Sequence, residues 1–308
     1  MASLSDAGPA AIARKRRFAL AAEPWIYAGP ALVLIITILL VPLAIGISYA
    51  FRNLVLLDPF GGEFIGLTHF GEIWHDGNFW NALRNTIEWT VVSVALQFVF
   101  GLILALLLNQ PFPGRWLVQA LVFLPWAVPT FLSGLNWAWL FNPVVGPLPY
   151  WFVHVGLMTT PENILSNPAA ALWGPITANV WWGIPFYAIT LLAALQSIPP
   201  DIYEAAQIDG AGPVTRFWSI TLPFLAPTIA ITLLLRAVWI ANAADLIVVM
   251  TRGGPADSTQ ILASYIFSQA FQRLDFGYAS AIATVLLVIL LVYAAFVITV
   301  RQFLIRAH

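Results

Sequence analysis

Between two long apolar runs, the chain carries a polar connection over residues 198–223 that reads IPPDIYEAAQIDGAGPVTRFWSITLP. Proline is tolerated in a first helical turn, so Pro199 and Pro200 can begin a helix there. Gly210 can end that helix, and Pro213 can begin the next one. This connection is therefore predicted to form two short helices joined by a bend.

The first of these helices is acidic and has a surface of small side chains. Asp201 and Glu204 place negative charge near the positive end of the helix dipole. Ala205 and Ala206 leave a smooth surface that another protein can approach closely. Two interpretations fit these residues equally well: insertion into a cleft on a soluble partner, and an ordinary amphipathic helix at a membrane surface.

The rest of the chain is too apolar for a water-soluble protein. Of its 308 residues, 60% are hydrophobic and 9% are charged, whereas about 25% of a typical soluble domain is charged. Crossing a bilayer takes about 20 apolar residues. Six runs reach that length, at 25–51, 87–109, 116–140, 171–197, 224–250 and 279–303. They are continuous, not alternating, so helices are predicted in preference to the strands of a barrel.

The positive charges predict the orientation of these spans. One side of the membrane would receive Arg14, Lys15, Arg16, Arg17, Arg115, Arg216, Arg301 and Arg306. The other side would receive Arg52, Arg84, Arg252 and Arg273, where acidic residues offset them. Both termini and the 198–223 connection are thus predicted to be cytoplasmic.

Several chemistries are excluded or disfavoured. The chain has no cysteine, which rules out disulfides and thiol catalysis. Its single lysine, Lys15, is followed by Arg16, so no phosphate-binding loop of the form GxxxxGK[ST] exists. The four histidines lack metal-ligand spacing and the acids form no catalytic pair, so we expect neither a catalytic nor a metal site. A membrane-embedded enzyme and an ion-coupled secondary carrier are therefore weaker alternatives.

A resemblance separates the two interpretations of the 198–223 connection. The spacing of Glu-Ala-Ala, Gly, Ile and Leu-Pro resembles the EAA loop of permease subunits in binding-protein-dependent ABC importers; its fixed positions are Glu204, Ala205, Ala206, Gly210, Ile220, Leu222 and Pro223. Other stretches resemble the carbohydrate-uptake branch, of maltose, trehalose and glycerol-3-phosphate type: Asn85-Thr86, Phe123-Leu124-Pro125-Trp126, residues 195–199, Arg252-Gly253-Gly254-Pro255 with Thr259, and residues 276–281. Arg252 departs from the small residue common in the family.

The resemblance implies an all-α integral membrane protein with six transmembrane helices and both termini inside. This is the type I ABC importer permease fold with a cytoplasmic coupling helix. The tail would span 1–24, the permease domain 25–303 with its coupling loop at 198–223, and the cytoplasmic end 304–308. The implied localisation is the bacterial or archaeal cytoplasmic membrane, and the implied function is sugar import; a glycerol-3-phosphate or polyol importer is the alternative.

The resemblance also implies partners. A second permease subunit, as a heterodimer, would complete the pathway, and an extracytoplasmic binding protein would deliver the solute. Two ATPase subunits would bind ATP and Mg, so this chain itself would bind no cofactor. The residues docking on an ATPase would be Glu204, Ala205, Ala206, Asp209 and Gly210.

Polar and aromatic residues inside the spans are the candidates for the solute pathway. Asn242 and Asp245 are three residues apart, so they are predicted to share a helix face that lines the cavity. The alternative for Asp245 is an ion pair with an arginine such as Arg252. Further candidates are Trp239, Trp126, Asn136, Trp137, Asn179 and Trp182. The alternative for the tryptophans is the membrane interface, which that residue type often marks.

Overall fold

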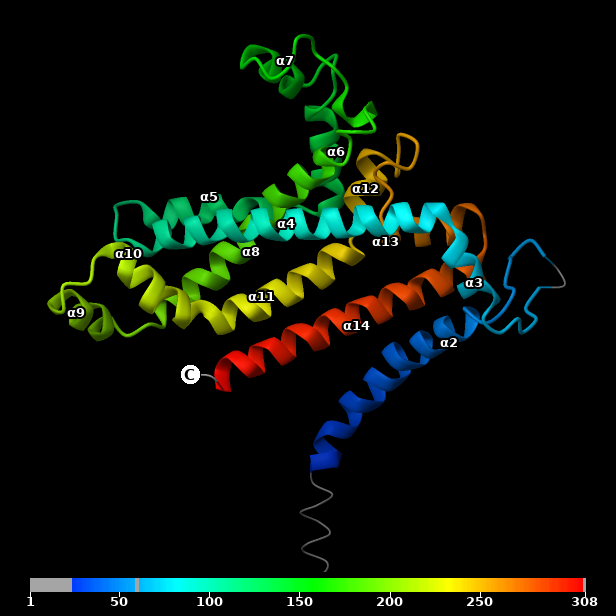
Figure 1. Ribbon diagram of the computed structural model, residues 1–308, viewed down its shortest axis with the longest axis horizontal. Coiled ribbons are helices and arrows are strands. Elements are labelled where there is room, and N and C mark those ends of the chain that lie inside the picture. Colours follow the sequence, from blue (N-terminus) through cyan, green and yellow to red (C-terminus); the bar gives the residue numbers. More distant parts are fainter. Residues whose placement is uncertain (1–23, 59–60, 307–308) are drawn as a thin grey trace, which may run out of the picture.

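Long apolar helices run along the molecule and form its body in the computed structural model (Figure 1). The structure describes residues 24–58 and 61–306, with side chains as far as residue 300. Five helical stretches within that part are long and apolar enough to cross a membrane: Pro24–Tyr49, Gly77–Asn109, Trp173–Gln196, Pro213–Met250 and Phe276–Val300. The predicted all-helical membrane fold is confirmed. The predicted tail 1–24 lies, except for Pro24, outside the described residues, as do His308 and the cations Arg14, Lys15, Arg16 and Arg17.

The predicted third span, 116–140, is not one continuous helix. It consists of α5 (Arg115–Ala127) and α6 (Thr130–Leu140), which meet at 94°. Val128 and Pro129 at the junction are extended, because the residue before a proline is pushed away from helical geometry. The predicted count of six spans holds only when this bent pair counts as one.

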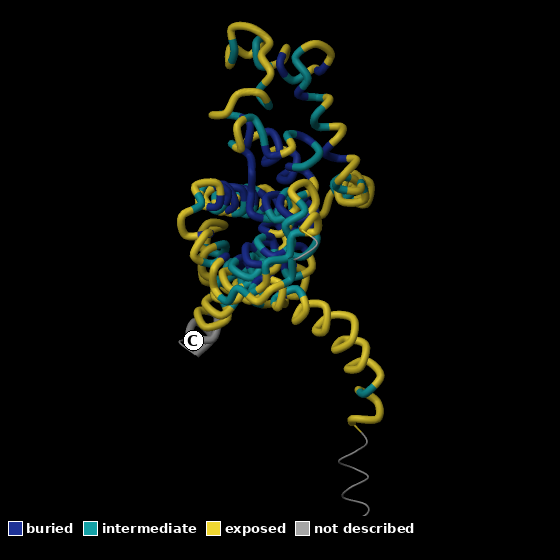
Figure 2. The backbone as a smooth tube through the Cα atoms, turned by 90° about the vertical axis from the view of Figure 1, so that its right-hand side faces the viewer, coloured by how far each residue is buried: buried dark blue, intermediate teal, exposed yellow. Residues whose placement is uncertain are grey.

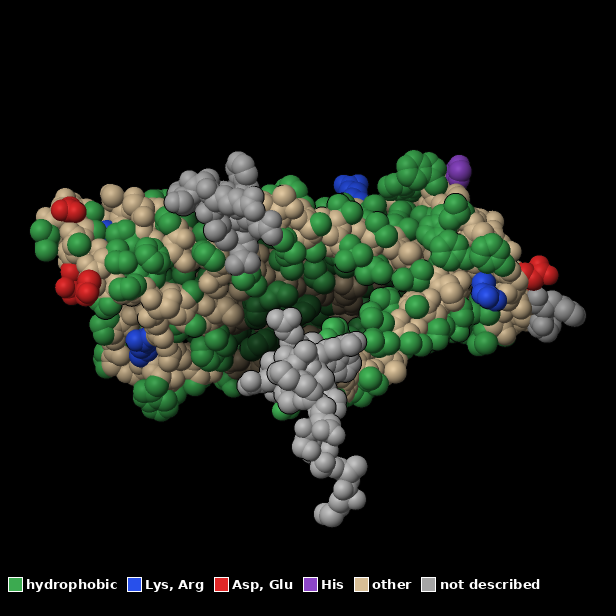
Figure 3. Space-filling model, turned by 90° about the horizontal axis from the view of Figure 1, so that it is seen from below, with side chains coloured by type: hydrophobic (Ala, Val, Ile, Leu, Met, Phe, Trp, Pro, Cys, Tyr) green, Lys and Arg blue, Asp and Glu red, His purple; other side chains and the backbone are tan. Residues whose placement is uncertain are grey.

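The core is built around α4 (Gly77–Asn109) and α8 (Trp173–Gln196). The two helices approach closely at Gly101, where a Cβ atom would overlap the Cβ of Tyr187. The helix α11 (Leu222–Asn242) packs against both of them, and α14 (Phe276–Arg306) packs against α11 (Figure 1). Seen from below, this face is apolar along its middle, with acidic side chains at its two ends (Figure 3).

The first span differs from the others in its packing. It runs from Pro24 through η1 (Ile35–Leu40) and α2 (Val41–Tyr49), and none of its most apolar window is buried. Figure 2 shows it projecting away from the body as an exposed helix. Only its far end, near α14, meets the rest of the chain.

The two ends of the body carry different connections (Figure 1). At one end lie α9 (Pro200–Ile208), α10 (Pro213–Arg216) and η3 (Phe217–Thr221). At the other end lie α3 (Thr68–His75), α13 (Leu262–Phe267) and η4 (Ser268–Gln272). A third group, α7 (Pro147–His154) and η2 (Ile164–Ser166), follows α6, and α12 (Asp245–Met250) follows α11.

Candidate functional site

The connection 198–223 forms the two short helices that the sequence predicts. Pro200 begins α9, Asp201 lies in its first turn, and Pro213 begins α10. Gly210 has a φ of +81°, a left-handed conformation that glycine adopts without steric cost. The next amide, that of Ala211, donates to the carbonyl of Ala206 at 2.8 Å and completes the helix end.

The residues predicted to dock on an ATPase lie on the outside of this loop. Glu204, Ala205, Asp209 and Gly210 are exposed, and Ala206 is half-buried. Within the connection, the Tyr203 hydroxyl lies 2.9 Å from the Thr221 hydroxyl and so ties α9 to η3. Tyr203 also packs beside the buried cluster that contains Leu195 and Leu225. The α9 helix is therefore anchored on one side and open on the other.

Within the spans, the structure brings together aromatic residues from three separate helices: Trp126, Trp182, Phe186 and Trp239, here called the aromatic group. The ring of Phe186 lies 6.1 Å from that of Trp126 and 5.6 Å from that of Trp239. The Trp182 indole donates to the Val128 carbonyl at the α5–α6 bend, at 2.8 Å. Trp126 and Trp239 are 41% and 49% exposed, so the group includes two tryptophans that are open in part.

A buried arginine lies against this group. Arg236 on α11 is 2% exposed, and its guanidinium carbon is 5.5 Å from the ring centres of both Trp182 and Phe186. The Gln97 side-chain oxygen accepts from its Nε at 2.9 Å and from its Nη2 at 2.7 Å. Gln97 in turn donates to the backbone carbonyl of Asn179 at 2.9 Å. The Asn179 side chain is buried, so it does not face an open cavity.

The predicted relation between Asn242 and Asp245 is wrong. Asn242 ends α11, Ala243 is extended, and Asp245 begins α12, so the two residues do not share a helix face. Asn242 donates to the Val238 carbonyl of its own helix at 2.9 Å. Asp245 accepts from the Thr130 hydroxyl at 3.0 Å, so its partner is on α6 and the alternative ion pair with an arginine is also wrong. Both side chains are nevertheless exposed.

Asn136 and Trp137 lie on α6, beyond the 94° bend. The Trp137 ring packs against Trp181 and Phe141, each at 6.0 Å, and not against the aromatic group. Asn136 is exposed. The structure thus assembles Trp126, Trp182 and Trp239 into one group and places the other candidates outside it.

Gln97 and Phe186 belong to this arrangement but were missed by sequence reasoning. Gln97 is a lone amide in the long apolar run of α4, and a polar side chain inside a span usually faces a partner or a cavity. That signal was available. Phe186 has no comparable signal, because phenylalanine is common in any span.

At the end of the body away from α9, the Asn85-Thr86 pair on α4 contacts the segment that contains the Arg252-Gly253-Gly254-Pro255 motif. The Asn85 side chain donates to the carbonyls of Ser258 at 3.1 Å and Gln260 at 2.9 Å, and the Thr86 hydroxyl accepts from the Leu262 amide at 2.8 Å. These bonds fasten residues 251–262, here called the outer loop, to α4. Arg252 in that loop has a φ of +53°, a conformation that favours glycine.

Near the outer loop, Asp76 at the start of α4 accepts from the hydroxyls of Tyr265 and Tyr278, each at 2.7 Å. Burial acts to raise the pKa of Asp76, but these hydrogen bonds and that of the Asn78 amide hold it below its ordinary value. Burial and the bond to Asp76 raise the pKa of Tyr265 to about 12.

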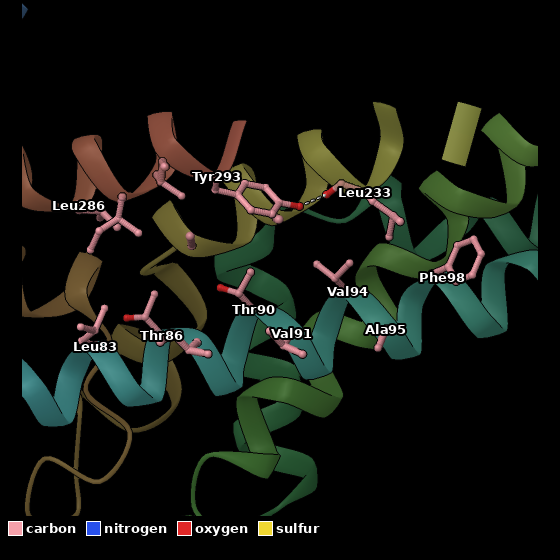
Figure 4. Close-up of a pocket in the computed structure, with 15 residues that line it drawn as sticks. Leu83, Thr86, Thr90, Val91, Val94, Ala95, Phe98, Leu233, Leu286 and Tyr293 are labelled. Carbon is pink, nitrogen blue, oxygen red and sulfur yellow. Dashed lines mark hydrogen bonds between the residues drawn. The ribbon is translucent and has the colours of Figure 1, made fainter. Parts of the chain in front are cut away.

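A cavity of about 480 Å³ lies between α4, α11 and α14 (Figure 4). Its walls are apolar apart from a few hydroxyls, and one of these, on Tyr293, points toward the Leu233 carbonyl at 3.5 Å. Such a lining suits hydrocarbon and offers few partners for a solute rich in hydroxyl groups. We therefore place the candidate solute-facing site at the aromatic group.

Comparison with known proteins identifies relatives over most of the chain. Residues 97–304 match the family described as binding-protein-dependent transport system inner membrane component. The trehalose/maltose transport system permease protein of Thermococcus litoralis is 37% identical over 78% of this chain and 80% of its own length. The sulfoquinovosyl glycerol transport system permease protein of Agrobacterium fabrum is 36% identical over 84% of this chain and 83% of its own length. A bacterial ABC transporter that imports the acidic polysaccharide alginate has a chain with a TM-score of 0.78 and 26% identity, covering 94% of this chain and 98% of that one.

Proposed function

The chain belongs to the family of binding-protein-dependent transport system inner membrane components, and on that premise we propose that it is the permease subunit of an ATP-driven sugar importer. The observation that carries the proposal is the EAA-type loop, which projects its acidic, small-sided helix from one end of the bundle. The names of the trehalose/maltose and sulfoquinovosyl glycerol relatives support a saccharide as the solute.

In this proposal, ATP is hydrolysed by separate subunits. The α9 helix with Glu204 docks in a cleft of an ATPase, and ATP-driven closure of two such subunits moves the attached spans. Tyr203 and the α10–η3–α11 segment would carry that motion, because they join the loop to a span without a break. The loop side is then cytoplasmic, as the positive charges predict.

A second permease subunit is also part of the proposal. In the described part of the chain, the first span has no buried residue in its most apolar window, and Trp126 and Trp239 stay 41% and 49% exposed. A partner across the pathway would face both. On the other side of the membrane, a binding protein would deliver the solute; the alginate transporter chain solved with a periplasmic protein has a TM-score of 0.77 to this one. The proposed localisation is the cytoplasmic membrane.

The aromatic group would supply the solute contacts. Aromatic rings stack on the apolar faces of sugar rings, and the partly exposed side chains of Trp126 and Trp239 are the proposed sites of such stacking. The exposed amide of Asn242 and the carboxylate of Asp245, close to Trp239 in the chain, are the proposed partners for hydroxyl groups. An acidic saccharide is the second candidate solute, because the similar alginate transporter imports an acidic polysaccharide.

The test is affinity purification of the chain from its native membrane in mild detergent, followed by mass spectrometry. We expect a stoichiometric ATPase, a second multi-span permease and a binding protein. Reconstituted in proteoliposomes, that complex should take up radiolabelled trehalose or an alginate oligosaccharide only with ATP inside. Recovery of the chain alone, under conditions that preserve other ABC complexes, would overturn the proposal.

A further inference from the structure

The buried guanidinium of Arg236 has an unusual set of partners. It lies inside the spans, where an arginine is costly to insert, yet no carboxylate pairs with it in the part of the chain that the structure describes. Its hydrogen-bonded partner is a neutral oxygen, that of Gln97, which is fully buried. A cation held this way is costly, and ionisable residues inside spans usually have a functional role.

The contacts of this pair connect three spans. Gln97 is on α4, Arg236 is on α11, and the Asn179 carbonyl that accepts from Gln97 is on α8. One turn further along α8, Gly183 lies so close to the pair that a Cβ would overlap both side chains. The helices thus meet at a site that only a glycine on α8 permits.

The aromatic group rests on the same contact. The guanidinium faces the rings of Trp182 and Phe186, and Phe186 in turn meets Trp126 and Trp239 edge to face. A guanidinium presents a rigid plane with donors in fixed directions, so two bonds to one oxygen fix its orientation. Any displacement of that plane would move the rings packed on it.

We propose that Arg236 and Gln97 are positioning residues for the solute-facing aromatic group, setting solute affinity without touching the solute. This inference rests on the proposed import function. The pair fixes the rotation of α8 against α4 and α11, and through it the ring of Phe186. Because the ATPase-docking loop lies at the far end of the bundle, the pair has no contact with that loop.

The first experiment needs no solute. The purified complex is labelled with 5-fluorotryptophan, and the ¹⁹F resonance of Trp182 is assigned with Trp182→Phe. Arg236→Lys keeps the charge but loses the rigid plane, and Gln97→Met keeps the volume but loses the acceptor. We expect both to move the Trp182 resonance beyond its linewidth. Arg84→Lys, at an exposed arginine of α4 outside this arrangement, should leave it in place.

The second experiment measures ATP-driven uptake of radiolabelled trehalose by the same variants in proteoliposomes. The loss of charge-assisted bonds predicts a rise of about tenfold in half-saturation for Arg236→Lys, with a maximal rate within about twofold of the wild type. Arg84→Lys should retain the wild-type value.

Two outcomes would overturn the proposal. One is a Trp182 resonance that does not move in Arg236→Lys. The other is a lower thermal midpoint and maximal rate with unchanged half-saturation, which would indicate a merely structural pair. If the wild-type complex takes up neither trehalose nor an alginate oligosaccharide, the proposed sugar function fails, and the ¹⁹F comparison alone decides the positioning role.

Discussion

The coupling loop at residues 198–223 and the outer loop at 251–262 are both rich in glycine and proline, yet they differ in how far they are buried and anchored. The outer loop is fastened by side chains of α4, and its residues Thr259, Ile261 and Leu262 are fully buried. The coupling loop leaves Ile208 87% exposed and Trp218 62% exposed. The outer loop is covered by residues of the same chain. The coupling loop exposes apolar side chains, which is typical of a surface that binds a partner.

The largest expected effect is at the coupling loop. Glu204→Lys reverses the charge of the exposed acid on α9, so a charge-assisted contact with the ATPase would become repulsive. We expect uptake and solute-stimulated ATP hydrolysis by the reconstituted complex to fall about 100-fold. The thermal midpoint of the chain should not change. The Glu204 side chain is exposed, and within the described residues it forms no ion pair. Glu63→Lys, at an exposed acid near the far end, serves as a charge-reversal control, and equal losses in both variants would remove the distinction between the loops.

A smaller effect is expected at the outer loop. Asn85→Ala removes a buried donor to the carbonyls of Ser258 and Gln260, which costs about 2 kcal/mol. Hydrogen exchange of the amides in residues 251–262 should therefore speed up about 30-fold. Asn81→Ala is the matched control, since Asn81 donates only to the Asp257 carbonyl, and its effect should be weaker. Unchanged exchange in Asn85→Ala would mean that the loop is not held from α4.

The outer end should also respond to acid. The pKa of Asp76 is lowered below its ordinary value of 3.8, so its hydrogen bonds to Tyr265 and Tyr278 stabilise the fold above that pH. This stabilisation should be lost as pH falls from about 4 through the lower pKa of the folded state. Exchange of the α13 amides between pH 5 and pH 3 measures it. Asp76→Asn should flatten that dependence, and an equal acid response in both proteins would contradict the assignment.

The smallest expected effect concerns the backbone of the outer loop. Arg252 has a φ of +53°, which costs a non-glycine residue about 1–2 kcal/mol, while glycine adds about 0.5–1 kcal/mol of entropy to the unfolded chain. Arg252→Gly should therefore raise the stability of the loop by less than about 1 kcal/mol, seen as slower exchange in residues 251–262. Faster exchange would show that the Arg252 side chain contributes more than its backbone costs.

The helices of the coupling loop were predicted correctly, because Pro200 and Pro213 begin helices and Gly210 ends one. Local rules failed between Asn242 and Asp245. Ala243 and Ala244 favour helix, but α12 is held against α6 by the Asp245–Thr130 bond and by close packing of Gly134 on Leu246 and Val249. These contacts join residues more than 100 positions apart, so no local pattern could reveal them.

The same reason hid most of the aromatic group. Trp126, Trp182 and Trp239 were predicted as candidates because they are tryptophans inside spans. Their contacts with Phe186 and Arg236 depend on tertiary packing. Gln97 was visible as a lone amide in an apolar run, but its partner could not be chosen from the sequence.

The unpacked first span has a consequence for how the protein is made. Pro24–Tyr49 precedes the other described spans in the chain, and among the described residues it meets the rest mainly at its far end, beside α14. It can enter the lipid and remain there as an independent helix while the later spans assemble around α4 and α8. Biogenesis would then proceed in two stages, with the core closing first and the leading helix free to meet whatever lies beside it in the bilayer.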